Sequence, residues 1–153
     1  MGVKISRYII RVYAIIINNT NEILISDEHQ LNIRMTKFPG GGMNFGEGPV
    51  DCLKREAIEE FGQEIEILAH FYTTDYFQPT QFYEDAQLIS IYYKAKFKEE
   101  IKFKISDKAF NFIEEKNGAQ SFRWKKIDKL DVNEFTFPID KKVAKLLKKE
   151  ILA

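Results

Sequence analysis

The sequence predicts a single α/β domain over residues 1–153 with a mixed β-sheet. Several segments are rich in β-branched and aromatic residues, as strands are, and two segments carry apolar side chains at helical spacing. No repeat, low-complexity tract or Pro/Ser linker divides the chain. The length of 153 residues, with 44% hydrophobic and 30% charged residues, fits one globular domain with a core of useful size.

The strand segments begin near the N-terminus. Residues 7–17 and 22–26 flank a run of Asn and Thr, which predicts a β-hairpin. Residues 27–30 are expected to form a loop, and residues 32–38 a short strand that leads to Pro39 and three glycines. Further strands are predicted over residues 64–75, 86–97 and 122–127.

Two helices are predicted from their end signals. Pro49 starts the first and Gly62 ends it, while Pro138 starts the last helix of the chain. The last helix has its apolar stripe at Val143, Ala144, Leu146 and Leu147. Between them, residues 98–104 are expected to form an exposed turn that leads into a short strand. Residues 106–115 are expected to form a further, short helix capped by Ser106. Asn117-Gly118 is expected to form a turn.

The first helix gathers carboxylates on one face. Val50, Leu53, Ala57 and Phe61 form its apolar stripe, whereas Glu56 and Glu60 lie one turn apart with Glu59 beside them. Like charges at this spacing cost an isolated helix about 0.2–0.5 kcal/mol, which a bound cation would remove. Hard oxygen ligands suit Mg²⁺, with Mn²⁺ as the alternative, and Mg²⁺ commonly binds together with substrate phosphates.

Composition excludes several classes of function. Lys plus Arg equals Asp plus Glu, so the chain has no electrostatic footprint for nucleic acid. The sequence has no continuous apolar run of membrane-helix length and no secretion signal, so cytoplasmic residence is expected. A single cysteine, Cys52, cannot form an internal disulfide, and a structural role is expected for it. The same role is expected for His29 and His70, because no Ser or Cys is placed by a motif to form a triad with either.

One segment, Gly41 to Gln63, carries a specific motif. Gly41 is followed after five residues by Glu47, and after seven more by Arg55-Glu56-Ala57-Ile58-Glu59-Glu60-Phe61-Gly62. This spacing resembles the signature of the Nudix hydrolases, G-x5-E-x7-R-E-U-x-E-E-x-G-U, in which U is a bulky aliphatic residue. All seven fixed Gly, Glu and Arg positions match, and the departures are the small Ala57 and the polar Gln63.

The resemblance implies an α/β/α sandwich with a mixed sheet and a Mg²⁺-dependent hydrolase that acts on a diphosphate. It assigns the metal to Glu56, Glu59, Glu60 and the Gly40 carbonyl, and it implies that Arg55 pairs with Glu47 to hold loop against helix. The matching segment, Gly41 to Gln63, is called the Nudix box below. The general base in this family is either a glutamate of the box, here Glu59, or an acid from a later loop. The later candidates are Glu114 and Glu115, with Glu84 behind them.

Substrate contacts are expected from three places. The backbone of Gly41 and Gly42 allows close approach of a ligand, and Arg34 and Lys37 are candidate phosphate partners. The 76–85 segment is an aromatic loop in which Phe77 and Phe82 could stack a base, a contact that contributes about 1–3 kcal/mol.

Three functions remain open. Pro79 resembles a proline that accompanies ADP-ribose as substrate in some Nudix subfamilies, and Asp27 and Glu28 stand where many triphosphatases carry arginines. Both features favour cleavage of a nucleoside diphosphate linked to another moiety, of the ADP-ribose or nucleotide-sugar type. The alternatives are a housecleaning pyrophosphohydrolase of (deoxy)nucleoside triphosphates and a non-catalytic nucleotide sensor. The partner is therefore a small-molecule nucleotide, and the aromatic-rich surface permits a homodimer.

Overall fold

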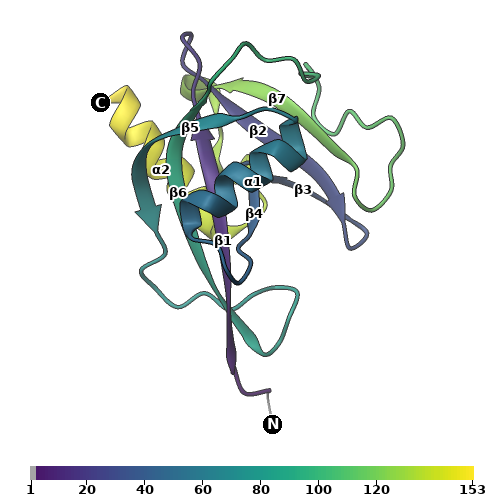
Figure 1. Cartoon of the computed structure of the whole chain (residues 1–153), viewed down its shortest axis with the longest axis vertical. Helices are drawn as coiled ribbons and strands as arrows, with labels where there is room; N and C mark the ends of the chain where they lie inside the picture. Colours follow the sequence, from purple (N-terminus) through teal and green to yellow (C-terminus); the bar gives the residue numbers. More distant parts are fainter. Residues whose placement is uncertain (1–2) are drawn as a thin grey trace. The chain divides into compact units, whose positions relative to one another are not determined.

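A computed structural model describes residues 3–153 as a mixed α/β fold (Figure 1). Its helices and strands agree with most of the predicted segments, and α1, β6 and α2 match their predicted ranges closely. In chain order the elements are β1 (Arg7–Ile16), β2 (Glu22–Gln30), β3 (Ile33–Lys37), β4 (Gly40–Gly42), α1 (Pro49–Phe61), β5 (Ile65–Thr73), β6 (Ala86–Phe97), β7 (Gln120–Lys126), the 3₁₀ turns η1 (Ile127–Lys129) and η2 (Val132–Glu134), and α2 (Pro138–Leu152).

The chain divides into two compact units, each built from two segments. Unit 1 comprises residues 3–14 and 40–100, and unit 2 comprises residues 15–39 and 101–153. The single-domain organisation therefore stays a prediction.

Unit 1 contains a four-stranded sheet in the order β4-β1-β6-β5. β4 is antiparallel to β1 and β5 is antiparallel to β6, whereas β1 and β6 run in the same direction (Figure 1). The sheet is therefore mixed, as predicted. Helix α1 covers one face of it and turns its buried side chains, Cys52, Leu53, Ala57 and Phe61, inward. Burial of this apolar face holds α1 in place, because a helix of 13 residues is marginal by itself.

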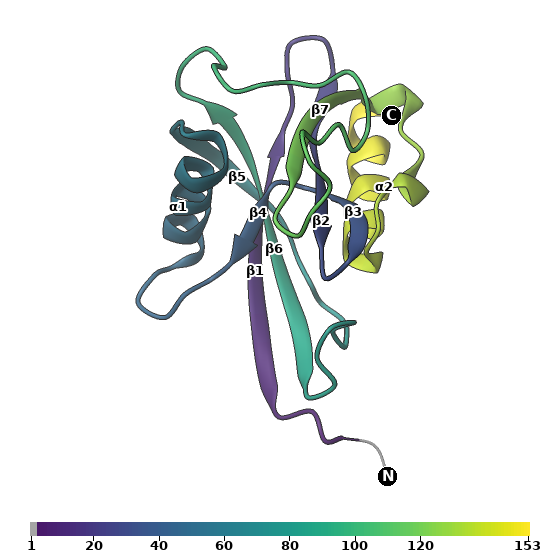
Figure 2. The ribbon, with the colours of Figure 1, turned by 90° about the vertical axis from the view of Figure 1, so that its right-hand side faces the viewer.

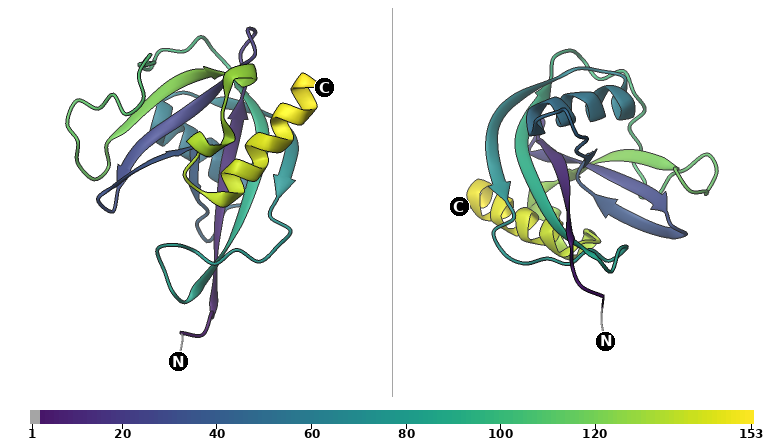
Figure 3. Two further views of the ribbon diagram at one scale, coloured as in Figure 1. Left: turned by 180° about the vertical axis from the view of Figure 1, so that it is seen from behind. Right: turned by 60° about the horizontal axis from the view of Figure 1, so that its bottom comes forward.

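Unit 2 contains a three-stranded antiparallel sheet in the order β3-β2-β7. Helix α2 lies beside η1 and η2 (Figure 3, left) and buries Ile139, Val143, Ala144 and Leu147. Leu146, predicted in the apolar stripe, is exposed instead. Within residues 3–153, no helix is long and apolar enough to cross a membrane.

The predicted β1–β2 hairpin is wrong. The turn exists, because Ile17 and Ile23 form an antiparallel bridge and the Asn18 amide donates to the Glu22 carbonyl at 3.0 Å. Beyond that bridge, however, β1 pairs in the β4-β1-β6-β5 sheet and β2 in the β3-β2-β7 sheet. A tight turn between two strands therefore did not determine which strands pair, because pairing depends on partners distant in sequence.

Residues 27–30 form the second half of β2 rather than the predicted loop. The polar run Asp27-Glu28-His29-Gln30 is tolerated in a strand because partners satisfy its buried carboxylates. Glu28 accepts from Ser26 Oγ at 2.8 Å and forms an ion pair with Lys37 at 3.3 Å. Burial with full pairing is the condition under which charged groups can occupy a sheet.

Asp27 lies at the centre of a larger polar network in unit 2. Its side chain is fully buried and accepts hydrogen bonds from Arg123 Nε at 2.7 Å and Thr36 Oγ1 at 2.8 Å. It also accepts from the Phe110 amide at 3.2 Å. One carboxylate thus joins β2, β3 and β7 to the segment that precedes β7.

The predicted helix over residues 106–115 does not form. Ser106 Oγ accepts from the Lys108 amide at 3.2 Å and from Asn111 Nδ2 at 2.8 Å, which closes a turn rather than capping a helix. Phe110 has a φ of 53°, outside the right-handed helical region, and its amide is held by Asp27. The short strand expected after residue 104 is reduced to one bridge between Ile105 and Phe122, while Gly118 forms the predicted turn with a φ of 95°.

We expect Asp27→Asn to lower the free energy of unfolding by about 3–5 kcal/mol, because it removes the buried charge 2.7 Å from the nearly buried Arg123 guanidinium and leaves that guanidinium with the longer ion pair to Glu134 at 3.9 Å. Urea denaturation at neutral pH measures the change. Glu114→Gln is the matched control, because Glu114 pairs with Lys116 on the surface of the same unit and should change stability by less than about 1 kcal/mol. Equal stabilities of the two variants would contradict the central role of Asp27.

Candidate active site

The loop before α1 and the first turn of the helix are shaped by local hydrogen bonds. The Asp51 carboxylate accepts from the Gly48 amide at 2.9 Å, Pro49 occupies the first turn, and the Cys52 amide begins the helical ladder by donating to the Gly48 carbonyl. At the other end, Gly62 adopts a left-handed conformation with a φ of 67° and donates to the Ile58 carbonyl. Both predicted ends of α1 are confirmed.

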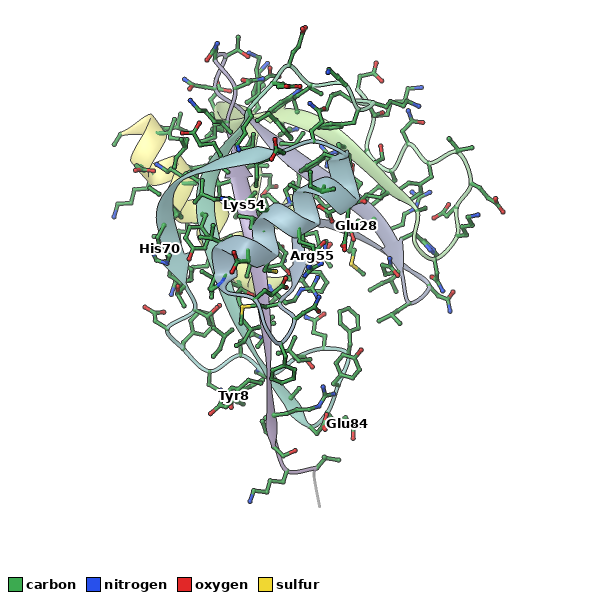
Figure 4. The ribbon with its side chains drawn as sticks, viewed as in Figure 1. Tyr8, Glu28, Lys54, Arg55, His70 and Glu84 are labelled. Atoms are coloured by element: carbon green, nitrogen blue, oxygen red, sulfur yellow. The ribbon has the colours of Figure 1, made fainter. Side chains whose placement is uncertain are left out.

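Arg55 is the centre of the charged cluster on α1. Its guanidinium donates twice to Glu47, from Nε at 3.0 Å and from Nη2 at 2.7 Å. Nη2 also donates to the Gly42 carbonyl at 2.9 Å, while Nη1 donates to Glu56 and to Glu59, each at 3.1 Å. Arg55 and Lys54 project from different sides of α1 (Figure 4), so only Arg55 reaches the loop. One side chain therefore ties the loop, β4 and two of the helix acids together.

The electrostatics of this cluster follow from its geometry. Hydrogen bonds from Arg55, then the bond from the Asn44 amide, lower the pKa of Glu47 to about 2. The same Glu47 bonds, with those to Glu56 and Glu59, raise the pKa of Arg55. Glu47 is thus an anion at neutral pH whose proton affinity is too low for a general base, which makes it a bracing residue.

We expect the Glu47–Arg55 pair to make stability depend on acid pH. The folded pKa of Glu47, about 2, lies below its ordinary value of 4.5, so the stabilisation is fully present above about pH 4.5 and is lost as the pH falls toward 2. Glu47→Gln should flatten this part of the profile. Urea midpoints between about pH 2.5 and 7 without metal measure it, with the exposed Glu66→Gln as control. Parallel profiles for wild type and Glu47→Gln would contradict the assignment.

Gly41 is required where β4 meets α1. A Cβ atom at this position would lie 2.3 Å from Glu56 Oε1, so the absent side chain leaves the space that the Glu56 carboxylate occupies. Cys52 is fully buried beside it, and its thiol lies 3.5 Å from the Gly42 carbonyl. Burial, with the nearby Glu47 charge, raises the pKa of Cys52 to about 11, so the thiol is neutral and structural, as expected from the sequence.

The acids of α1 form a set of hard oxygen donors that fits Mg²⁺ or Mn²⁺ by chemistry. Glu56 is nearly buried against β4, Glu59 is largely exposed, and Oε2 of Glu60 is buried. In the arrangement described for residues 3–153, no three His, Cys, Asp or Glu side chains converge as a metal site. The reason is visible in the contacts: Arg55 draws Glu56 and Glu59 toward its own guanidinium.

Comparison with known proteins identifies the family. The model of the NUDIX domain matches residues 7–147 of the chain. The chain belongs to the Nudix family. Over 54 residues it is 43% identical to an RNA pyrophosphohydrolase of Helicobacter pylori (strain G27). That stretch is 35% of this chain and 34% of the relative, so the match spans about a third of the relative's length.

Solved structures share the Nudix fold at low sequence identity. The E. coli ORF135 protein superposes with a TM-score of 0.70 at 16% identity, over 95% of this chain and 93% of that one. A NUDIX hydrolase from Nitrosomonas europaea gives 0.67 at 15% identity, over 93% and 88%. MutT, from a study of Aliivibrio salmonicida and Vibrio cholerae, gives 0.62 at 22% identity, over 94% and 99%. The α/β fold with a mixed sheet, expected from the Nudix resemblance, is confirmed.

Outside the Nudix box, the structure brings two predicted site residues together in unit 2. Arg34 of β3 donates to Glu115 from Nε at 2.6 Å and from Nη2 at 2.8 Å, and its guanidinium lies 5.1 Å from the ring centre of Phe110. The Arg34 bonds lower the pKa of Glu115, so this carboxylate is a weaker base than an ordinary glutamate. Glu114 is exposed and lies 3.6 Å from Lys116.

Lys37 is buried rather than presented on the surface. Its ammonium lies 3.3 Å from Glu28, and the same carboxylate accepts from Gln120 Nε2 at 3.2 Å. The contacts of Glu28 with Lys37 and Gln120 were not predicted, because a loop was expected at residues 27–30. The apolar run 23–25 continues into polar residues without Gly or Pro, and this was the one signal that β2 continues.

The 76–85 segment lies on the face of the unit 1 sheet opposite α1 (Figures 2 and 3). Phe77 and Phe82 are exposed there, as is Glu84 (Figure 4). The segment therefore does not join the acids of α1 across the sheet of unit 1, and a base-stacking role for these rings stays a prediction. Of the two histidines, His70 bonds Thr73 at 2.8 Å, while Nδ1 of His29 is buried and forms no hydrogen bond.

Proposed function

We propose that the protein is a divalent metal-dependent pyrophosphohydrolase that cleaves the diphosphate linkage of a nucleoside diphosphate joined to another moiety. ADP-ribose and nucleotide sugars are the substrate type. The observation that supports the reaction class is the cluster around Arg55. The Arg55 guanidinium donates to the carboxylates of Glu47, Glu56 and Glu59 and to the carbonyl of Gly42. The family match and the pyrophosphohydrolase named among the relatives support the same reaction.

Glu56, Glu59 and Glu60 would hold Mg²⁺, with Mn²⁺ as the alternative and the Gly40 carbonyl as a further ligand. When bound, such an ion neutralises the diphosphate and lowers the pKa of its bound water. Arg55 keeps Glu47 ionised and the loop closed on the helix. Because Arg55 keeps its two bonds to Glu47, Glu56 and Glu59 can turn from it toward a cation without releasing the loop.

Glu59 is our choice of general base. Its carboxylate is 58% exposed and its one described hydrogen bond is to Arg55, so it can both reach solvent and accept a proton. Glu115 is less suited, because two bonds from Arg34 lower its pKa. Glu114, on the surface beside Lys116, has no contact that would orient it toward a reacting atom. The exposure and contacts of Glu59 therefore favour it as the base.

A diphosphate linkage is favoured over a triphosphate by the state of the two cations that are candidate phosphate partners. Between residues 22 and 38 the cationic side chains are Arg34 and Lys37, and both already bind carboxylates, Glu115 and Glu28. A third phosphate would need one of them to exchange its partner. The second candidate, a pyrophosphohydrolase of nucleoside triphosphates or of RNA, rests on the relative named RNA pyrophosphohydrolase and on the MutT-like folds.

A substrate screen tests the proposal. The full chain with Mg²⁺ is incubated with ADP-ribose, nucleotide sugars, dinucleoside polyphosphates, (deoxy)nucleoside triphosphates and 5′-triphosphorylated RNA, with Glu59→Gln as the matched variant. Release of AMP from ADP-ribose, lost in the variant, is the expected result. Release of pyrophosphate from a triphosphate or from RNA would show that the second candidate function is the right one. Binding of a nucleotide without turnover of any substrate would indicate a sensor and would contradict the proposed enzymatic activity.

A further inference from the structure

Residues 76–88 form a folded aromatic hairpin in unit 1 rather than an open loop. Pro79 and Gln87 form an antiparallel bridge, the Thr80 amide donates to Ala86, and the Leu88 amide donates to Gln78 at 2.8 Å. At its tip, Thr80 Oγ1 donates to the Tyr83 carbonyl at 2.8 Å and accepts from the Tyr83 amide at 3.0 Å. The rings of this hairpin are therefore presented from a preorganised backbone.

The start of β1 holds the hairpin in place. The amides of Ser6 and Arg7 both donate to the Asp85 carbonyl, and Arg7 Nε donates to the Asp85 carboxylate at 3.0 Å. The Arg7 guanidinium also lies 4.8 Å from the ring centre of Tyr83, a cation–π contact. Two distant segments of the chain thus form one surface.

This surface leaves four aromatic side chains 38–60% exposed, namely Tyr76, Phe77, Phe82 and Tyr83. At this exposure, the four aromatic side chains together present about 400 Å² of accessible surface. A standard interface buries about 800 Å² on each partner, a little over half of it apolar, so the surface supplies the apolar part of one such interface. Patches of this size on soluble proteins commonly mark contact sites, and Tyr, Phe and Arg are enriched in them.

The charges around the rings indicate the partner. Arg7 and Asp85 pair with each other at 3.0 Å, and Lys4 and Glu84, their neighbours along the chain, carry opposite signs, so these groups give the surface no net charge. Figure 4 shows Glu84 at the end of unit 1 where β1 begins. A two-fold contact brings the same patch of both copies together, and a patch without net charge does not repel its own copy. A polyanion would instead need a predominantly basic surface.

We propose that the aromatic hairpin, with the start of β1, is the surface through which two copies of this chain associate. It lies on the face of the unit 1 sheet opposite α1, so the contact leaves the acids of α1 uncovered by the partner's hairpin (Figure 2). No group of the Nudix box takes part in this contact.

Sedimentation velocity on the full chain at about 1–100 μM tests this proposal, because that range brackets a micromolar dissociation constant. The expected mass of wild type at the upper end is twice the 18.0 kDa of one chain. Phe77→Asp should weaken association by at least about 30-fold, as loss of a central aromatic contact does. Ile113→Asp, at an apolar side chain of unit 2 that is more exposed than Phe77, is the control and should sediment as wild type.

Cross-linking gives a second measurement that needs no disruptive substitution. Glu84→Cys treated with a short bis-maleimide should yield a covalent dimer, whereas Ile113→Cys and wild type should not, because Cys52 is fully buried. A monomeric wild type at every concentration overturns the proposal, and so does a Phe77→Asp protein that associates like the control. A Phe77→Asp protein with unchanged mass but a raised KM would assign the hairpin to substrate instead.

Discussion

Glu60→Gln is expected to reduce Mg²⁺-dependent hydrolysis by about 10²–10³-fold, the loss typical when one preorganised electrostatic contact is removed from a transition state. Glu60 follows Glu56 by one turn of α1, and its Oε2 is buried, so its charge is held in a poorly solvated position. The neutral amide keeps the shape of the side chain and removes only the charge. The apolar face of α1 is untouched, so thermal unfolding without metal should stay close to wild type.

Two measurements separate loss of metal binding from loss of fold. Mn²⁺ binding followed by electron paramagnetic resonance should weaken in Glu60→Gln, while the far-UV circular dichroism stays that of wild type. Glu66→Gln, an exposed glutamate of β5 paired with Lys96, is the control and should leave both activity and Mn²⁺ binding unchanged. If Glu60→Gln keeps more than about a tenth of the activity, Glu60 is not a metal ligand.

Gly40→Ala and Gly41→Ala are expected to fail in different ways although the residues are neighbours. A Cβ on Gly40 would lie 2.1 Å from the Val12 carbonyl and 2.8 Å from Tyr13 Cα, and the φ of 149° is one that side chains rarely adopt. Neither backbone group can move without breaking the β1–β4 pairing. We therefore expect Gly40→Ala to lower the free energy of unfolding by about 3 kcal/mol, from backbone strain and overpacking together.

At Gly41 the three atoms nearest to the Cβ would all belong to the Glu56 carboxylate, with Oε1 at 2.3 Å. That group ends a flexible side chain and can turn away, so Gly41→Ala should change stability by less than about 1 kcal/mol. It should nevertheless reduce kcat/KM by more than about tenfold, because Glu56 leaves its place beside Arg55. Urea denaturation and steady-state kinetics on both variants check the pair. A fully active Gly41→Ala protein would show that the position of Glu56 does not matter to the reaction.

The sequence was most informative where structure depends on neighbours along the chain. Pro49 and Gly62 mark the ends of α1 by their own backbone preferences, and a segment rich in β-branched and aromatic residues predicted β6 at residues 86–97. Within the candidate site, the Glu47–Arg55 pair was expected from the Nudix resemblance and is present. Contacts of Arg55 with Glu59 and the Gly42 carbonyl were not expected, because a signature records residue types rather than side-chain directions.

Prediction failed where a residue's state depends on partners far along the chain. The polar run after Ser26 was expected to form a loop, yet Asp27 is buried in β2 because Arg123, 96 residues later, neutralises it. The same Asp27 holds the Phe110 amide, and the predicted helix over residues 106–115 does not form. Arg34, a candidate phosphate partner, lies against Glu115, a contact that was not predicted from the sequence, and its role in phosphate binding stays a prediction.

By itself, then, the sequence determined the family, the acid face of α1 and the turns that bound it, because these depend on residue types at short spacing. Tertiary structure decided which strands pair, which charges are buried, and on which face of the unit 1 sheet the aromatic hairpin lies. These outcomes depend on contacts between residues tens of positions apart, whose free energy no local pattern records.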